Sequence, residues 1–185
     1  MINKIIEEIV NSNYRVIAID GRCASGKTTI CKKLQEKINC EVIHLDDFFL
    51  RSSQQTKERL LEVGGNIDYE RFEQEVLIKI KSNEPFSYQP YNCTRNAYDE
   101  SLYIENNRIL IIEGSYSHHP RFVNYYDYLV FLTVDKQVQL ERLEKRNKKL
   151  LLRFITEWIP KEETYFNQFK ILEKANMVID SSKIN

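Results

Sequence analysis

The chain has 185 residues, of which 42% are hydrophobic, and this is enough apolar material for one substantial core, so we expect a single domain over residues 1–185. Lysine plus arginine and aspartate plus glutamate each total 27, which gives a formal net charge of zero. This balance excludes a protein whose whole surface is drawn to nucleic acid or to anionic lipid.

The N-terminal segment, residues 1–10, mixes Lys4, Glu7 and Glu8 with apolar residues, which predicts an amphipathic helix and argues against a signal peptide. No apolar run approaches the roughly 18 residues of a membrane-spanning helix. We therefore expect a cytoplasmic protein that binds neither membrane nor nucleic acid. Whether it forms a homo-oligomer is left open. The cysteines show no zinc-binding spacing and no Cys-x-x-Cys pair, so we expect free thiols at Cys23, Cys31, Cys40 and Cys93.

Five short runs rich in β-branched or apolar residues predict strands, at residues 14–20, 41–45, 108–112, 128–134 and 177–179. Apolar residues at helical spacing predict helices, at residues 27–37, 69–81, 136–146 and 152–171. Strands that alternate with helices pair in parallel through right-handed crossovers, which bury both faces of the sheet. We therefore expect an α/β fold of three layers around a mostly parallel five-stranded sheet.

A phosphate-binding motif follows the first predicted strand. Residues 21–28, Gly-Arg-Cys-Ala-Ser-Gly-Lys-Thr, match the P-loop pattern G-x-x-x-x-G-K-[ST] and open a predicted helix. Backbone N–H groups of such a loop face phosphate oxygens, Lys27 is expected to neutralise the β and γ phosphates from an exposed loop, and Thr28 to bind Mg²⁺. The motif predicts a P-loop NTPase fold that binds a nucleotide with Mg²⁺, but it does not fix the reaction, since GTPases, transport ATPases, recombination ATPases and small-molecule kinases all share it. The expected nucleotide-binding residues are Gly21, Ala24, Ser25, Gly26, Lys27, Thr28 and Thr29.

Acidic residues end two further predicted strands at the same edge of the sheet. Asp46 and Asp47 follow the second strand, and Glu113 closes the third. A carboxylate there can accept the proton of an acceptor hydroxyl that attacks the γ-phosphate, or it can cap a following helix. Glu113 can hold Mg²⁺ through water or be a surface acid. His44 alternates with apolar neighbours and is expected to be packed.

These segments resemble, in their order, uridine kinases and related phosphoribulokinase-like and nucleoside kinases. The resemblance rests on the P-loop at 21–28, the Asp-x-aromatic-aromatic run at 46–49, the Asn-Ile-Asp segment at 66–68, and Glu113 with Gly114. It extends over most of the chain, including residues 127–180. It implies an ATP- and Mg²⁺-dependent phosphotransferase that acts on a hydroxyl of a small metabolite.

The resemblance also implies roles for single residues. Asp46 matches the catalytic base that contacts the acceptor, and Asp68 matches an acid that holds the ribose hydroxyls. Tyr91 and Arg95 lie in a segment, residues 82–105, that is similar to a substrate-covering hairpin. Lys27 and two arginines are expected to be catalytic, and the arginines belong to a short lid at about residues 142–155. The two arginines are Arg142 and Arg146. In the alternative interpretation they lie on a solvated helix face and pair with neighbouring glutamates.

The implied acceptor is the 5'-hydroxyl of a nucleoside, uridine or cytidine first. Asn92 lies where an acid is often found, which leaves nicotinamide riboside, pantothenate or another small alcohol as alternative acceptors. A different class, a P-loop regulatory ATPase that acts on a partner protein, is also open. A GTPase switch is disfavoured because the Asn147-Lys148 pair lacks the aspartate that reads guanine.

Overall fold

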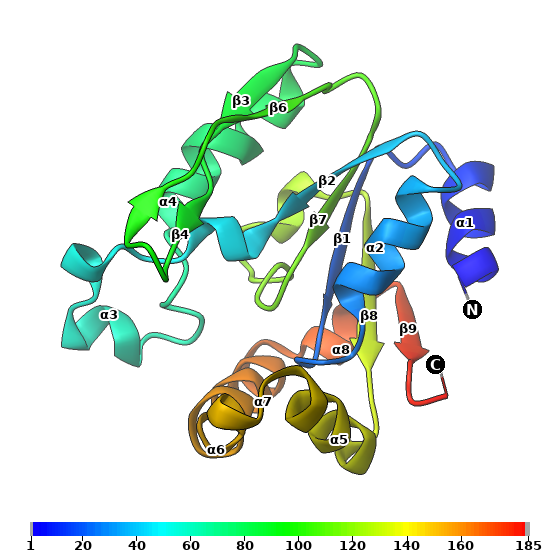
Figure 1. The fold of residues 1–185 in the computed structure, drawn as a ribbon. Helices are drawn as coiled ribbons and strands as arrows, with labels where there is room; N and C mark the ends of the chain where they lie inside the picture. The colour runs from blue at the N-terminus through cyan, green and yellow to red at the C-terminus, as the bar shows by residue number, and fades with distance from the viewer. Residues whose placement is uncertain (1, 184–185) are drawn as a thin grey trace.

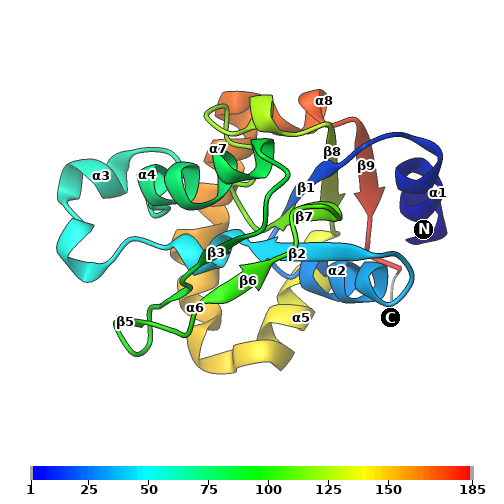
Figure 2. The same ribbon diagram turned by 90° about the horizontal axis from the view of Figure 1, so that it is seen from above.

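The computed structural model describes residues 2–183 and shows a five-stranded parallel sheet with helices on both faces (Figures 1 and 2). The strand order is β2-β7-β1-β8-β9. Every neighbouring pair in this sheet is parallel, which confirms the predicted fold class. The strands are β1 (Val16–Gly21), β2 (Cys40–His44), β7 (Ile109–Glu113), β8 (Tyr128–Thr133) and β9 (Met177–Asp180).

Each face of the sheet has its own hydrophobic core, because successive residues of a strand point to opposite sides. Along β1, Val16 packs in one core, whereas Ile17 and Ile19 pack in the other. The first core includes residues of α4, α7 and α8, and the second includes residues of α1 and α2. These helices are α1 (Ile2–Asn11), α2 (Lys27–Gln35), α4 (Tyr69–Phe72), α7 (Ile159–Phe169) and α8 (Ile171–Lys174).

Two predicted helices are interrupted by irregular turns. The helix expected at 69–81 starts as α4 and continues as a π turn (Glu73–Leu77) and a 3-10 turn (Lys79–Lys81). After α5 (Lys136–Asn147), the chain continues through a 3-10 turn (Lys148–Leu150), α6 (Leu151–Arg153) and a π turn (Phe154–Trp158) into α7. The predicted lid therefore lies inside one long helical run.

The segment expected to be a loop or hairpin, residues 82–105, forms two short antiparallel pairs beside the main sheet (Figure 2). β3 (Phe86–Tyr88) pairs with β6 (Leu102–Ile104), and β4 (Tyr91–Asn92) pairs with β5 (Ala97–Tyr98). A short helix, α3 (Lys57–Leu61), lies in the connection between β2 and α4. Within residues 2–183, none of the helices has the length and apolar character needed to cross a membrane.

Candidate active site

The predicted P-loop, residues 21–28, joins β1 to α2 at the carboxyl edge of the sheet (Figure 1). A Cβ atom on Gly21 would lie 2.1 Å from the carbonyl oxygen of Leu132, and its φ is +142°. Gly26 has open space around it, but its φ of +87° disfavours any side chain. Ala24 is also left-handed, with a φ of 57°. The loop thus has the tight turns that the motif predicts.

Lys27 crosses the base of this loop. Its ammonium donates to the carbonyl oxygens of Gly21 at 2.7 Å and Arg22 at 3.2 Å, and lies 3.4 Å from Ser115 Oγ. The residue is only 8% exposed, so the expectation that it stands on an exposed loop was wrong: the loop folds around its own lysine. The Ser25 hydroxyl is buried and has no hydrogen-bond partner among residues 2–183, which fits a loop that receives a polar ligand.

The residues predicted to bind Mg²⁺ lie together. The Thr28 hydroxyl donates to Glu113 Oε1 at 3.1 Å. A hydroxyl and a carboxylate are oxygen ligands of the kind that Mg²⁺ prefers, and the ion completes its shell with water and phosphate. Among the residues that the structure describes, no three His, Cys, Asp or Glu side chains converge on a metal position. Thr29, also predicted to contact nucleotide, follows on the first turn of α2 and is exposed.

His44 holds the other oxygen of Glu113, with Nδ1 at 2.5 Å from Oε2. The two residues are partners in the parallel register of β2 and β7. Burial alone would raise the pKa of Glu113, but the hydrogen bond from His44 and the charge of Lys27 lower it overall. The same hydrogen bond raises the pKa of His44. The His44 side chain is 40% exposed, so the expectation of a packed histidine was wrong.

Asp46 and Asp47 lie in a 3-10 turn, Leu45–Phe48, that begins where β2 ends. Asp46 keeps exposed surface, yet enough protein surrounds its carboxylate that lost hydration raises its pKa, with the charge of Glu113 adding to the rise. Asp47 is half-buried, and its Oδ2 accepts a hydrogen bond from the Tyr88 hydroxyl at 2.8 Å. The Asp47 carboxylate therefore holds Tyr88 of β3. The pKa of Asp46 instead responds to the charges of Glu113, Lys27 and His44.

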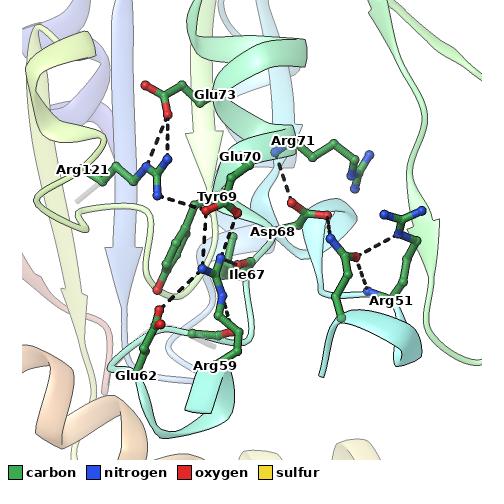
Figure 3. Close-up of polar contacts among 12 residues, drawn as sticks. Arg51, Arg59, Glu62, Ile67, Asp68, Tyr69, Glu70, Arg71, Glu73 and Arg121 are labelled. Carbon is green, nitrogen blue, oxygen red and sulfur yellow. Dashed lines mark hydrogen bonds and ion pairs between the residues drawn. The ribbon is translucent and has the colours of Figure 1, made fainter. Parts of the chain in front are cut away.

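Asp68 is placed beside this turn by the backbone, because its N–H donates to the carbonyl oxygen of Phe48 at 2.7 Å. It is 3% exposed. One carboxylate oxygen caps α4 by accepting from the Arg71 N–H at 3.1 Å, and the other accepts from the Gln54 amide at 2.8 Å (Figure 3). Gln54 in turn accepts from Arg51. The predicted diol-binding acid is therefore already held at both oxygens.

The predicted residues of the substrate-covering segment bond within their own hairpin. The Tyr91 hydroxyl donates to Asn96 Oδ1 at 2.5 Å, and the Arg95 guanidinium pairs with Asp99. Tyr91 is buried and Arg95 is exposed. Between the hairpin and the loop after β2 lies an open cavity of about 390 Å³, lined by Arg51, Ser52, Ser53, Tyr91, Asn96, Ala97 and Tyr98. Of the two predicted residues, only Tyr91 lines it.

The two predicted lid arginines lie in different surroundings. Arg142 reaches the P-loop, where it donates to the Ala24 carbonyl oxygen at 3.3 Å, and it also donates to the Ser181 carbonyl oxygen at 2.9 Å. Arg146, one turn further along α5, is exposed. Arg153 pairs with Glu157 at 2.8 Å. One predicted lid arginine thus contacts the loop directly, although it binds backbone there.

Sequence reasoning missed four side chains that hold the P-loop, which are Ser115, Gln139, Glu162 and Glu163. Arg22 is paired with Glu163 at 2.8 Å. The Cys23 N–H donates to Glu162 Oε2 at 2.9 Å, and the Cys23 carbonyl oxygen accepts from the Gln139 amide at 2.9 Å. Ser115 donates to Glu162 Oε1 at 2.8 Å. These partners are far apart along the chain and follow no spacing rule, so no local pattern could have identified them.

The thiol of Cys23, inside the P-loop, is unlike an activated cysteine. Burial raises its pKa to about 12, and the charge of Glu162 adds to this effect. Cys31 and Cys40 are buried, whereas Cys93 in the hairpin is exposed. All four cysteines are free thiols, as predicted.

A larger cavity, of about 550 Å³, lies away from these residues, between α3, the start of α4 and the end of α7. Arg59 and Arg121 contribute to its wall and are each paired with Glu70 (Figure 3). Tyr69 stacks on His119 there, with ring centroids 4.9 Å apart. None of the residues predicted to bind nucleotide or acceptor lines this cavity.

A family model described as an AAA domain matches residues 17–153 of the chain. Among curated proteins, the chain is 27% identical over 134 residues to the tRNA-specific adenosine deaminase subunit tad2 of Schizosaccharomyces pombe, covering 69% of this chain and 32% of that protein. It is 29% identical over 142 residues to uridine kinase-like protein 5 of Arabidopsis thaliana, covering 71% of this chain and 30% of that protein. The chain therefore spans about a third of the length of these two relatives.

A uridine kinase of Limosilactobacillus reuteri strain DSM 20016 is 24% identical over 173 residues, which cover 86% of this chain and 78% of that protein. The solved structure of a possible uridine kinase from Bacillus stearothermophilus superposes with a TM-score of 0.74 at 19% identity, covering 97% of each chain. At this identity the superposition establishes the shared fold.

Proposed function

Because this chain belongs to the AAA domain family and is similar to uridine kinases, we propose that it transfers the γ-phosphoryl group of ATP to a hydroxyl of a small metabolite. The observation that carries this proposal is the meeting of three strand ends at one edge of the sheet. Lys27 and Thr28 follow β1, Asp46 follows β2, and Glu113 ends β7. This arrangement supports a loop that binds phosphates beside an oxygen pair that would hold Mg²⁺ and a carboxylate that would accept a proton.

Each of these residues has its own role in the proposed reaction. The acceptor oxygen forms a bond to the γ-phosphorus while the bond from that phosphorus to the β–γ bridging oxygen breaks, and ADP leaves. Lys27 stabilises the charge that develops on the phosphates, and Asp46 takes the hydroxyl proton. Mg²⁺, when bound beside Thr28 and Glu113, supplies further positive charge to the phosphates. The raised pKa of Asp46 makes it a better proton acceptor than an ordinary aspartate.

For the acceptor we propose a nucleoside, uridine or cytidine first, because the fully buried Asp68 is fixed beside the Asp46 turn. A second kinase reading replaces the nucleoside by nicotinamide riboside, pantothenate or another small alcohol. Tyr91 lines the nearby cavity and would contact the distal part of the acceptor. Arg142 and Arg146 would assist at the phosphates as the lid moves.

One assay tests the proposal. Labelled ATP and Mg²⁺ are incubated with the protein and a panel of nucleosides and small alcohols, and Lys27→Ala is run in parallel. We expect label on one acceptor class with the native chain, and a loss well beyond tenfold with Lys27→Ala, because the P-loop lysine is an electrostatic catalyst. Hydrolysis of ATP without transfer to any acceptor would contradict the kinase and support a regulatory ATPase that acts on a protein partner.

A further inference from the structure

Helix α7 is fastened to two consecutive residues of the P-loop. Glu163 pairs with the Arg22 guanidinium, with Nε to Oε1 at 2.8 Å and Nη2 to Oε2 at 3.0 Å. Glu162 accepts the Cys23 backbone N–H at 2.9 Å. A backbone N–H at the front of a P-loop lies among the groups that attract phosphate, so Glu162 places a carboxylate in a region built for anions.

Glu162 is also close to the lysine of the loop. Its second oxygen accepts the Ser115 hydroxyl at 2.8 Å, and Ser115 Oγ lies 3.4 Å from the Lys27 ammonium. Two hydrogen-bonding steps therefore connect Glu162 to Lys27. The residue is 5% exposed. Burial raises the pKa of Glu162 above that of an ordinary glutamate, although the charge of Lys27 and the hydrogen bonds from Cys23 and Ser115 partly offset the rise.

We propose that Glu162 is a positioning residue that fixes the front of the P-loop, and that its charge weakens the binding of nucleoside triphosphate. This inference rests on the proposed function only through its nucleotide site. The γ-phosphate is cradled by the loop beside Lys27. The Glu162 carboxylate, two hydrogen-bonding steps from the same lysine, repels that phosphate, and the repulsion is poorly screened inside the protein.

The geometry itself does not need the charge. A glutamine at position 162 can accept the Cys23 N–H through its amide oxygen and donate to Ser115 through its amide nitrogen. The charge of Glu162 therefore has an effect that can be separated from its hydrogen bonds: it lowers the affinity of the loop for nucleoside triphosphate.

Direct binding of MgATP and MgADP to purified protein tests the charge. We compare the native chain, Glu162→Gln and Glu173→Gln, a matched loss of one carboxylate at an exposed position of α8. We expect Glu162→Gln to bind MgATP at least threefold tighter, with a smaller gain for MgADP, which lacks the γ-phosphate. Glu173→Gln should bind both nucleotides as the native chain does. Equal or weaker binding of MgATP by Glu162→Gln would overturn the inference.

Glu162→Ala tests the positioning. Alanine removes both hydrogen bonds together with the charge, so we expect it to bind MgATP at least threefold more weakly than Glu162→Gln, while circular dichroism shows a folded protein for both. Equal affinities of these two variants would contradict the positioning role. A native chain that binds no MgATP would contradict the proposed function itself. A native chain that binds MgATP, with Glu162 variants that bind it equally well, would contradict only the role of Glu162.

Discussion

His44 Nδ1 and Glu113 Oε2 lie 2.5 Å apart at the ends of two adjacent strands, β2 and β7. Thr28 holds the other Glu113 oxygen at 3.1 Å. The carboxylate is therefore oriented from both sides, by the last residue of β2 and by a residue in the first turn of α2. Groups that orient a metal ligand in this way commonly decide how well the ligand binds its ion.

Glu113→Gln should raise the Mg²⁺ concentration for half-maximal activity by roughly 10- to 100-fold, because a neutral amide is a weaker ligand and changes the pairing with His44. The measurement is a Mg²⁺ titration of phosphate transfer at saturating ATP and acceptor. Glu36→Gln, at an exposed position after α2, is the matched control. An unchanged Mg²⁺ requirement in Glu113→Gln would remove Glu113 from the metal site.

Asp46→Asn should lower acceptor phosphorylation by roughly 10²- to 10⁴-fold while ATP still binds, because the amide has the same shape but cannot take the proton. Asp47→Asn should keep most of its activity, since its amide oxygen can still accept the hydroxyl of Tyr88. Both variants are measured at a saturating acceptor concentration. An inactive Asp47→Asn beside a near-normal Asp46→Asn would reverse the assignment, and two near-normal enzymes would exclude this mechanism.

Asp68→Asn should raise the acceptor KM by roughly tenfold and leave the KM for ATP unchanged, because the charged acceptor of hydroxyl hydrogen bonds is lost. The fold should survive, since asparagine caps a helix about as well as aspartate. Gln54→Ala is the comparison: it removes the amide that bonds Asp68 but keeps the charge, so its effect on acceptor KM should be smaller. A higher KM for ATP alone would refute the acceptor role of Asp68.

The fold should lose stability in acid partly through His119. Burial, with the charges of Arg121 and Arg59, lowers the pKa of His119 from 6.5 to about 4. Between these two values the unfolded chain takes up a proton that the folded chain does not, so the stabilisation present above pH 6.5 is lost as pH falls towards 4. At about 1.4 kcal/mol for each pKa unit, the loss is at most about 3 kcal/mol.

Urea unfolding of the native chain and of His119→Gln at several pH values between 7 and 4 measures this effect. The difference in unfolding free energy between the two proteins should shift against the native chain as the pH falls, because glutamine does not titrate. Parallel stability curves for the two proteins over this range would show that His119 titrates alike in folded and unfolded chains.

The sequence was sufficient for the features that depend on local pattern. The apolar runs located all five strands of the main sheet, because strands buried on both faces have few polar residues. The P-loop was found because its glycines are required by backbone geometry, as the +142° φ of Gly21 shows. The fold and the position of the phosphate loop could therefore be predicted.

Tertiary contacts could not be predicted in the same way. Glu162 is 139 residues from Cys23, and nothing in its helix marks it as a partner of the loop. His44 was expected to pack because it alternates with apolar neighbours, but it is the last residue of an edge strand, where one side has no neighbouring strand. Its role depends on β7 ending beside it.

The contrast between the cysteines has a practical consequence for labelling. The P-loop thiol of Cys23, whose pKa is near 12, has almost no thiolate at neutral pH and should resist maleimides and oxidants. Cys31 and Cys40 are buried, and Cys93 alone among the four is exposed. A single fluorophore can thus be attached to the hairpin, beside the cavity that Tyr91 lines, without mutating the chain, and it would report on that hairpin as ligands bind.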